Sequence, residues 1–148
     1  MTGAADSQGA RLAVRFARPA DRDWCAAQDP HITPELLAQK IAAGEVVVAE
    51  RDGRPVGYLR LEYLWATLPF ISLIRVLDEE RRQGVGRAIL AFLEAALRGR
   101  GHDLLLSSSR VDEPPAQAWH RAVGFEECGI LAGVNAGGVG EVFFRKRL

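Results

Sequence analysis

The amino-acid sequence predicts a single α/β domain, and three observations support this expectation. The chain has 148 residues, of which 48% are hydrophobic, enough for one domain with its own core. Runs of β-branched and aliphatic residues alternate with segments of helical periodicity. No internal repeat or linker interrupts this alternation. No apolar run reaches about 18 residues, so no membrane span is expected. We therefore expect residues 11–148 to form one domain, behind a small, polar and disordered tail at residues 1–10.

The N-terminal half is expected to contain a strand, two short helices and a hairpin. The strand is placed near Leu12–Ala17. Asp21 and Thr33 are predicted N-cap residues of the two helices, and Gly44 ends the second helix. The run EVVVAE-RDGR-PVGYLRLEY follows, and its Asp-Gly pair between apolar segments predicts a tight turn between two strands.

The C-terminal half is expected to alternate strands and helices. FISLIRVL is too apolar for a surface strand and is placed in the middle of the sheet. Val85, Ile89, Leu93 and Leu97 then recur at intervals of four, which predicts a helix with one buried stripe. DLLLSSS is a further buried strand, and Asp112 is the predicted N-cap of the helix in DEPPAQAWHRAVG. Two last strands surround a glycine-rich loop.

Composition and charge narrow the classes of function. The 19 basic and 19 acidic residues cancel, whereas sequence-independent nucleic-acid binding normally needs a basic excess. The two cysteines form no CxxC pair and the three histidines are scattered, so no metal site is expected. The N-terminus lacks the apolar core of a secretory signal. We expect a cytoplasmic protein without metal, nucleic-acid or membrane partners.

The stretch RRQGVGRAIL combines two glycines, three arginines and the start of a helix. The first turn of a helix has unpaired N–H groups and partial positive charge, and glycines let an anion approach the backbone. The ATP-type motif GxxxxGK[ST] is absent, and a dinucleotide fingerprint needs glycine where Ile89 stands. Two interpretations stay open, a pyrophosphate cradle or capping glycines with solvated arginines. The expected cradle residues are Arg81, Arg82, Gln83, Gly84, Val85, Gly86, Arg87 and Ala88.

The order of elements and two short motifs resemble the GNAT family of N-acetyltransferases. The pyrophosphate loop of that family reads [RQ]xxGx[GA], and Arg81, Gly84 and Gly86 stand at those positions. A second mark of the family is an aromatic helix that ends in Gly-Phe, here the segment Trp119–Phe125. The resemblance covers about Val14–Leu148, nearly the whole chain.

The resemblance implies a fold and an activity. It implies a mixed, mostly antiparallel sheet of six to seven strands, splayed at the centre, with about four helices. Acetyl-CoA would lie between the splayed strands, with its pantetheine arm along the backbone of Ile74 and Val76. The implied reaction is direct attack on the thioester by a primary amine of a small molecule, peptide or protein. The alternative is a non-catalytic acyl-CoA-binding or sensor module on the same fold.

The catalytic candidates depart from the family pattern. The family usually carries tyrosine four residues before the glycine of Gly-Phe, and this chain has His120, an imidazole able to transfer protons near neutrality. His120 is the predicted proton donor, and a histidine packed beside Trp119 is the alternative. Some members carry a glutamate early on the splayed strand, where this chain has Phe70. Glu62 is the predicted substitute for this base, and the alternative is that Glu62 is an ordinary surface residue. A serine hydroxyl at 107–109 is a candidate to hold a bridging water.

The acceptor pocket is expected among the helix after Thr33 and the loops at 64–69 and 132–140. Trp65, Tyr63 and Asn135 are its candidate lining residues. For Trp65, two other interpretations stay open, packing on the core and a contact in a homodimer.

Overall fold

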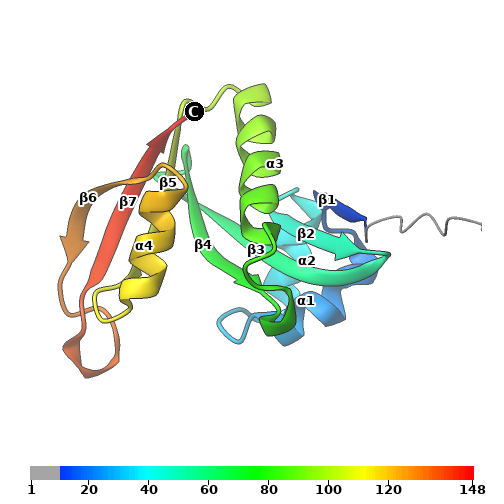
Figure 1. Ribbon diagram of the computed structural model, residues 1–148, viewed down its shortest axis with the longest axis horizontal. Coiled ribbons are helices and arrows are strands. Elements are labelled where there is room, and N and C mark those ends of the chain that lie inside the picture. The colour runs from blue at the N-terminus through cyan, green and yellow to red at the C-terminus, as the bar shows by residue number, and fades with distance from the viewer. Residues whose placement is uncertain (1–10) are drawn as a thin grey trace, which may run out of the picture.

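The computed structural model describes residues 11–148, and the tail expected at residues 1–10 lies outside them. It contains one seven-stranded sheet and four α-helices, with α3 and α4 in front of the sheet and α1 and α2 behind it (Figure 1). The strands are β1 (Leu12–Phe16), β2 (Val46–Arg51), β3 (Arg54–Leu64), β4 (Leu68–Val76), β5 (Leu104–Arg110), β6 (Glu126–Leu131) and β7 (Glu141–Arg147). The helices are α1 (Arg22–Gln28), α2 (Pro34–Ala42), α3 (Val85–Gly99) and α4 (Pro114–Ala122).

The sheet is mixed and mostly antiparallel, as predicted. Its strand order is β1-β2-β3-β4-β5-β7-β6, and the neighbours β4 and β5 run parallel because α3 crosses between them. The strand FISLIRVL becomes β4, the middle strand of seven, which confirms its expected central position.

The sheet splits between β4 and β5. These two strands pair at only two positions, Phe70 with Leu106 and Ile71 with Ser107, although both strands continue. The β3–β4 register shifts immediately after Ile71, which leaves Ser72 as an extra residue in β4. A bulge of this kind bends its strand and increases the local twist. The bulge therefore directs the rest of β4 away from β5, and the predicted splay is confirmed.

Strand β2 is buried on both faces of the sheet. Val47 and Ala49 join the larger core cluster under α3, whereas Val46 and Val48 join a second cluster under α1 and α2. The predicted stripe of α3 is confirmed, since Val85, Ile89, Leu93 and Leu97 are each at most 1% exposed. Gly57 of β3 permits this packing, because a β-carbon there would lie 2.7 Å from Cδ1 of Ile89.

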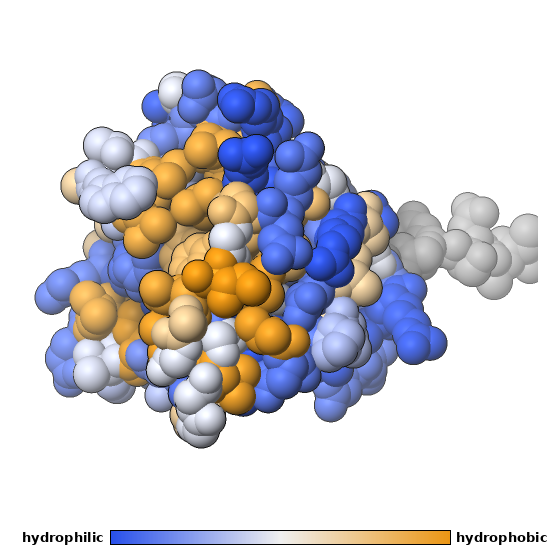
Figure 2. All heavy atoms as spheres, turned by 90° about the vertical axis from the view of Figure 1, so that its left-hand side faces the viewer, coloured by the Kyte–Doolittle hydropathy of each residue, from blue (hydrophilic) through white to orange (hydrophobic). Residues whose placement is uncertain are grey.

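Edge strand β6 is exposed along its whole length. Four large apolar residues in β6 and in the loops near it are exposed to solvent. Figure 2 shows apolar atoms gathered on this side of the molecule. These exposed residues are Val111, Ile130, Leu131 and Val134.

Two of the three predicted N-cap positions are confirmed and one is wrong. Thr33 caps α2 by accepting a hydrogen bond from the Leu36 N–H at 3.2 Å. Asp21 occupies the cap position of α1, although its carboxylate binds Arg15 and makes no bond to the first turn of that helix. Asp112 binds Arg110 instead, and Glu113 occupies the cap position of α4. A guanidinium offers an aspartate two charged donors at once, so a nearby arginine changes which groups the carboxylate binds.

Asp29 joins the α1–α2 connection to the sheet. Its carboxylate has no exposed surface and accepts hydrogen bonds from Tyr58 Oη and Arg60 Nε, both at 2.7 Å. Burial opposes ionisation, but the hydrogen bonds from Arg60 and Tyr58 outweigh it and lower the pKa of the Asp29 carboxyl. The buried ion pair thereby holds the connection against β3.

We predict that Asp29→Ala lowers the free energy of unfolding by about 3 kcal/mol or more, because Arg60 loses its buried partner. Urea denaturation measures this change. The matched control is Asp23→Ala, since the Asp23 side chain is 93% exposed and its removal should change stability by no more than about 0.5 kcal/mol. A loss below about 1 kcal/mol for Asp29→Ala would contradict the role given to this pair.

Candidate active site

The loop between β4 and α3 presents free N–H groups at a helix start. The first backbone bond into α3 runs from the Ala88 N–H to the Gly84 carbonyl at 3.0 Å. The N–H groups of residues 85–87 come before this bond and have no acceptor within the helix. Gly84 has φ +80°, a left-handed conformation that suits glycine, and Arg82 has φ +61°. A 15-residue helix adds its dipole, so the loop fits a phosphate anion.

The three arginines of the loop are not equivalent. Arg81 is held by the Asp78 carboxylate at 3.0 Å and by the Val76 carbonyl at 3.5 Å. Arg82 and Arg87 are exposed and have no carboxylate partner within residues 11–148. These two side chains therefore carry the uncompensated positive charge of the loop.

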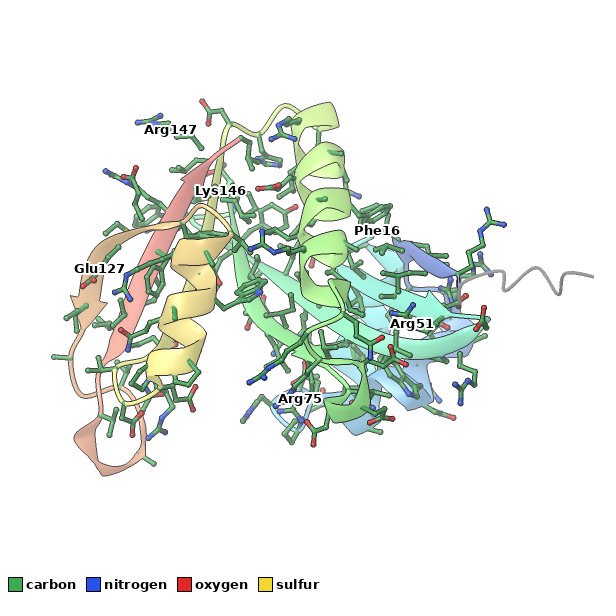
Figure 3. The ribbon with its side chains drawn as sticks, viewed as in Figure 1. Phe16, Arg51, Arg75, Glu127, Lys146 and Arg147 are labelled. Atoms are coloured by element: carbon green, nitrogen blue, oxygen red, sulfur yellow. The ribbon has the colours of Figure 1, made fainter. Side chains whose placement is uncertain are left out.

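The split between β4 and β5 opens toward this loop. Past Ile71 and Ser107, the β4 edge that carries the half-buried residues Ile74 and Val76 no longer pairs with β5. A cavity of about 320 Å³ opens at the end of β4, lined by Gln28, Arg75, Val76, Leu77, Asp78, Glu79 and Arg81. Figure 3 places Arg75 near the lower end of the sheet, beside the connection into α3.

Trp119 of α4 packs against the start of α3. A β-carbon on Gly86 would lie 3.4 Å from Cζ2 of Trp119, which is van der Waals contact, so the indole covers this glycine closely. Trp119 also packs on the larger core cluster.

His120 is 3% exposed and points into the structure beneath α4. Its Nδ1 lies 2.8 Å from the Ala116 carbonyl, which can only accept, so Nδ1 carries the proton. Its Nε2 lies 2.7 Å from Ser107 Oγ, and in the neutral ring this nitrogen accepts a hydrogen bond from the Ser107 hydroxyl. The ring stacks on Phe144 with centroids 4.6 Å apart and an interplanar angle of 2°.

Two features bear on the predicted role of His120. Ser107 is the last β5 residue paired with β4, so the Ser107–His120 bond lies at the vertex of the split. Burial lowers the pKa of His120 more than its bond to the Ala116 carbonyl raises it. A neutral ring has no proton on Nε2 to donate, and the proton-donor role of His120 stays a prediction.

Glu62 lies on β3 opposite Phe70, close to the same vertex. Its carboxylate is paired with Lys40 at 2.7 Å and with Nη1 of Arg60. The two cations balance the charge of the carboxylate and occupy its oxygens. The role of Glu62 as a base also stays a prediction.

The structure separates the three residues expected to line the acceptor pocket. Tyr63 and Trp65 belong to the β3–β4 hairpin at the start of β4. Asn135 donates a hydrogen bond to Glu141, and Glu141 pairs in register with Arg110, the last residue of β5. Because β4 and β5 are parallel, these are opposite ends of the split pair. Trp65 is 84% exposed, so the interpretation that it packs on the core is wrong.

The open face of the split holds residues that the sequence analysis did not single out. Glu141 and Phe143 alternate along β7, and their side chains share one face with Ser108 of β5. Phe143 stacks on Phe70 of β4 with ring centroids 5.7 Å apart. The alternating pattern in EVFF (141–144) indicates a strand with two different faces. It does not indicate which face stays uncovered, because that depends on where the helices pack.

A sheet split between parallel strands, with a free helix N-terminus at the mouth of the split, defines the class of acyl-CoA-dependent acyltransferases. Residues 13–125 match the acetyltransferase (GNAT) family, and the chain belongs to this family. The aminoglycoside N(6′)-acetyltransferase type 1 of Stenotrophomonas maltophilia is 37% identical, over 77% of this chain and 86% of that protein. The chain is thus an acetyl-CoA-dependent N-acetyltransferase, and the predicted enzymatic activity is confirmed.

Solved structures share the fold. Ribosomal-protein-alanine N-acetyltransferase from Brucella melitensis has 26% identity and a TM-score of 0.77, over 92% of this chain and 99% of that one. Ard1 from Thermoplasma volcanium has 19% identity and a TM-score of 0.81, over 93% and 97%. The protein yncA from Salmonella typhimurium, solved with its cofactor acetyl-CoA, has 19% identity and a TM-score of 0.74, over 93% and 94%.

Two further findings concern metals and membranes. Residues 11–148 contain no group of three or more histidine, cysteine, aspartate or glutamate side chains arranged to hold a metal ion. In the same part of the chain, no helix is long and apolar enough to span a membrane. The cytoplasmic location expected from the sequence stays a prediction.

We predict that replacing Arg82 and Arg87 together by alanine weakens acetyl-CoA binding about 10-fold or more, equivalent to about 1.4 kcal/mol. Both guanidiniums are uncompensated at the helix start, and their effect should shrink in high salt. Calorimetry measures the affinity. The matched control is Arg98→Ala, which removes an exposed arginine from the other end of α3. Equal affinities for the double variant and this control would refute the cradle.

We predict that stability falls as pH drops below about 6.5, because unfolded His120 then binds a proton that the buried ring resists. The slope from this one site is at most about 1.4 kcal/mol per pH unit. Urea denaturation from pH 5 to 8 should give a flatter pH dependence for His120→Phe than for the wild type. The control variant is His31→Phe, which removes an exposed histidine instead of the buried one. An unchanged slope in His120→Phe would show that burial does not perturb this imidazole.

Proposed function

We propose that the acceptor of this acetyltransferase is an aminoglycoside, a polycationic aminosugar acetylated on a primary amine. The observation that carries this proposal is the curated relative, an aminoglycoside N(6′)-acetyltransferase with 37% identity over 77% of this chain. The open face of the split supports it, because stacked rings and carboxylates suit a ligand that is apolar on its sugar faces and cationic at its amines.

We infer that acetyl-CoA occupies the split. The N–H groups of residues 85–87 and the guanidiniums of Arg82 and Arg87 would hold the pyrophosphate, and the unpaired edge of β4 at Ile74 and Val76 would bind the pantetheine amides. The bound cofactor supplies the acetyl thioester. In this arrangement the thioester lies near the vertex at Ser107, where only two residue pairs join β4 to β5.

The reaction forms a C–N bond and breaks a C–S bond, and a proton passes in net from the amine nitrogen to the sulfur. The Ser107 hydroxyl and the His120 ring form a hydrogen-bonded pair at the vertex. These are the groups through which the chain would move that proton. An acceptor that reaches the vertex from the open face meets the thioester on the side away from α3 and α4.

The choice of acceptor is tested with neomycin B and paromomycin I, which differ only in carrying an amine or a hydroxyl at the 6′ position. We expect acetyl-CoA-dependent thiol release with neomycin and only the background rate with paromomycin. Mass spectrometry of the product should show one added acetyl group. A peptide with an N-terminal alanine is included, because one structural neighbour is named for that substrate.

Other results of this assay would lead to different conclusions about the acceptor. Equal rates with both aminoglycosides would exclude the 6′ amine as the acceptor. Turnover of the peptide alone would replace the aminoglycoside by a protein N-terminus. Acetyl-CoA binding without turnover of any amine would favour the non-catalytic sensor.

A further inference from the structure

Glu141 is exceptional among the shielded carboxylates of residues 11–148. Eight aspartate and glutamate residues in this range are buried or half-buried. Seven of them form an ion pair with arginine or lysine, and Glu141 forms none. The seven paired residues are Asp21, Asp29, Glu45, Glu50, Glu62, Glu80 and Glu94.

Neutral groups hold the Glu141 carboxylate in place. Ser108 Oγ donates to Oε1 at 2.8 Å, and Asn135 Nδ2 donates to Oε2 at 2.8 Å. Arg110 is the β5 register partner of Glu141, but its guanidinium is turned to Asp112 through two bonds of 2.9 Å. The carboxylate is therefore oriented by two neutral donors, and Arg110 attracts it only from beyond ion-pair distance. A half-buried charge in this state is stabilised by any cation that reaches it.

The position of Glu141 relates it to the split. Ser108, to which it bonds, is one residue past the last pair between β4 and β5. Glu141 and Phe143 share the open face of β7, whereas Phe144 faces α4 and stacks on His120. The carboxylate thus lies beside the vertex, on the face opposite α4, next to the ring pair of Phe70 and Phe143.

The geometry points to Glu141 as the residue that recognises the acceptor: its carboxylate binds an ammonium group of the incoming amine. This inference rests on the proposed function, because it places the acceptor on the open face. Phe70 and Phe143 form an apolar wall beside the carboxylate, and their rings contribute a cation–π attraction to the same ammonium. Glu62 lies on this face as well, but Lys40 and Arg60 already neutralise it. Selectivity for cationic acceptors is assigned to Glu141.

The test is steady-state kinetics of Glu141→Gln with neomycin B and acetyl-CoA. Glutamine keeps the size and polarity of the side chain and removes its charge. We expect the KM for neomycin to rise about 10-fold or more, as for loss of one charged contact. The KM for acetyl-CoA should stay at the wild-type value, since the cofactor binds at the other face. Glu141→Asp, which restores the charge, should recover part of the loss.

The control variant is Glu126→Gln. Glu126 pairs in register with Arg145 of β7 and is 79% exposed, so the same charge is removed one strand further out on the sheet. We expect wild-type kinetics from it. An unchanged neomycin KM in Glu141→Gln, or an equal rise in both variants, would overturn the inference while the proposed function stands.

A binding measurement separates this inference from the proposed function. If the wild type turns over no aminoglycoside, the proposed function fails, and calorimetry of neomycin with each folded variant still decides the role of Glu141. Weaker binding to Glu141→Gln than to Glu126→Gln supports the ammonium site. Equal binding, or none to the wild type, overturns it.

Discussion

The early end of pairing between β4 and β5 is the constraint on which the rest of this structure depends. Two residue pairs join the strands, and past them both edges present backbone groups that a continuous sheet would satisfy. The extra residue Ser72 in β4 is the local cause, because a bulge redirects the strand. The split creates the space for a ligand, gives that ligand hydrogen-bonding edges, and directs β4 into the loop that begins α3.

Contacts across the split keep its two sides in a defined relation. Lys146 of β7 forms an ion pair with Glu94 of α3 at 2.6 Å. It also donates a hydrogen bond at 2.7 Å to the carbonyl of Val123, the residue that follows α4. Figure 3 shows Lys146 between the two helices. At the N-terminal end of α3, Trp119 of α4 packs on Gly86. The strands separate while the helices that cover them stay joined. The cofactor loop and the Ser107–His120 pair are consequently held on opposite walls of one site.

Charge is distributed so that most shielded carboxylates are neutralised within the protein. Arginine pairs stabilise the connection after α1 through Asp29 and the turn before α3 through Glu80. Arg82 and Arg87 at the cofactor loop and Glu141 on β7 form no ion pair within residues 11–148, have opposite signs and lie at different parts of the split. This separation suits a reaction between an anionic cofactor and a cationic acceptor, each attracted to its own side of the sheet.

Features that depend on local pattern could be predicted from the amino-acid sequence. They are the apolar stripe from Val85 to Leu97, the Thr33 cap and the glycine loop, because periodicity, capping and backbone freedom involve residues close together in the chain. The partners of the polar side chains could not be predicted in this way. His120 is joined to Ser107, Glu62 to Lys40 and Arg60, and Glu141 to no cation, since these relations arise between elements that meet only when the sheet has formed. A residue's chemistry at the site depends on those partners, which is why the family was readable from the sequence and the acceptor side was not.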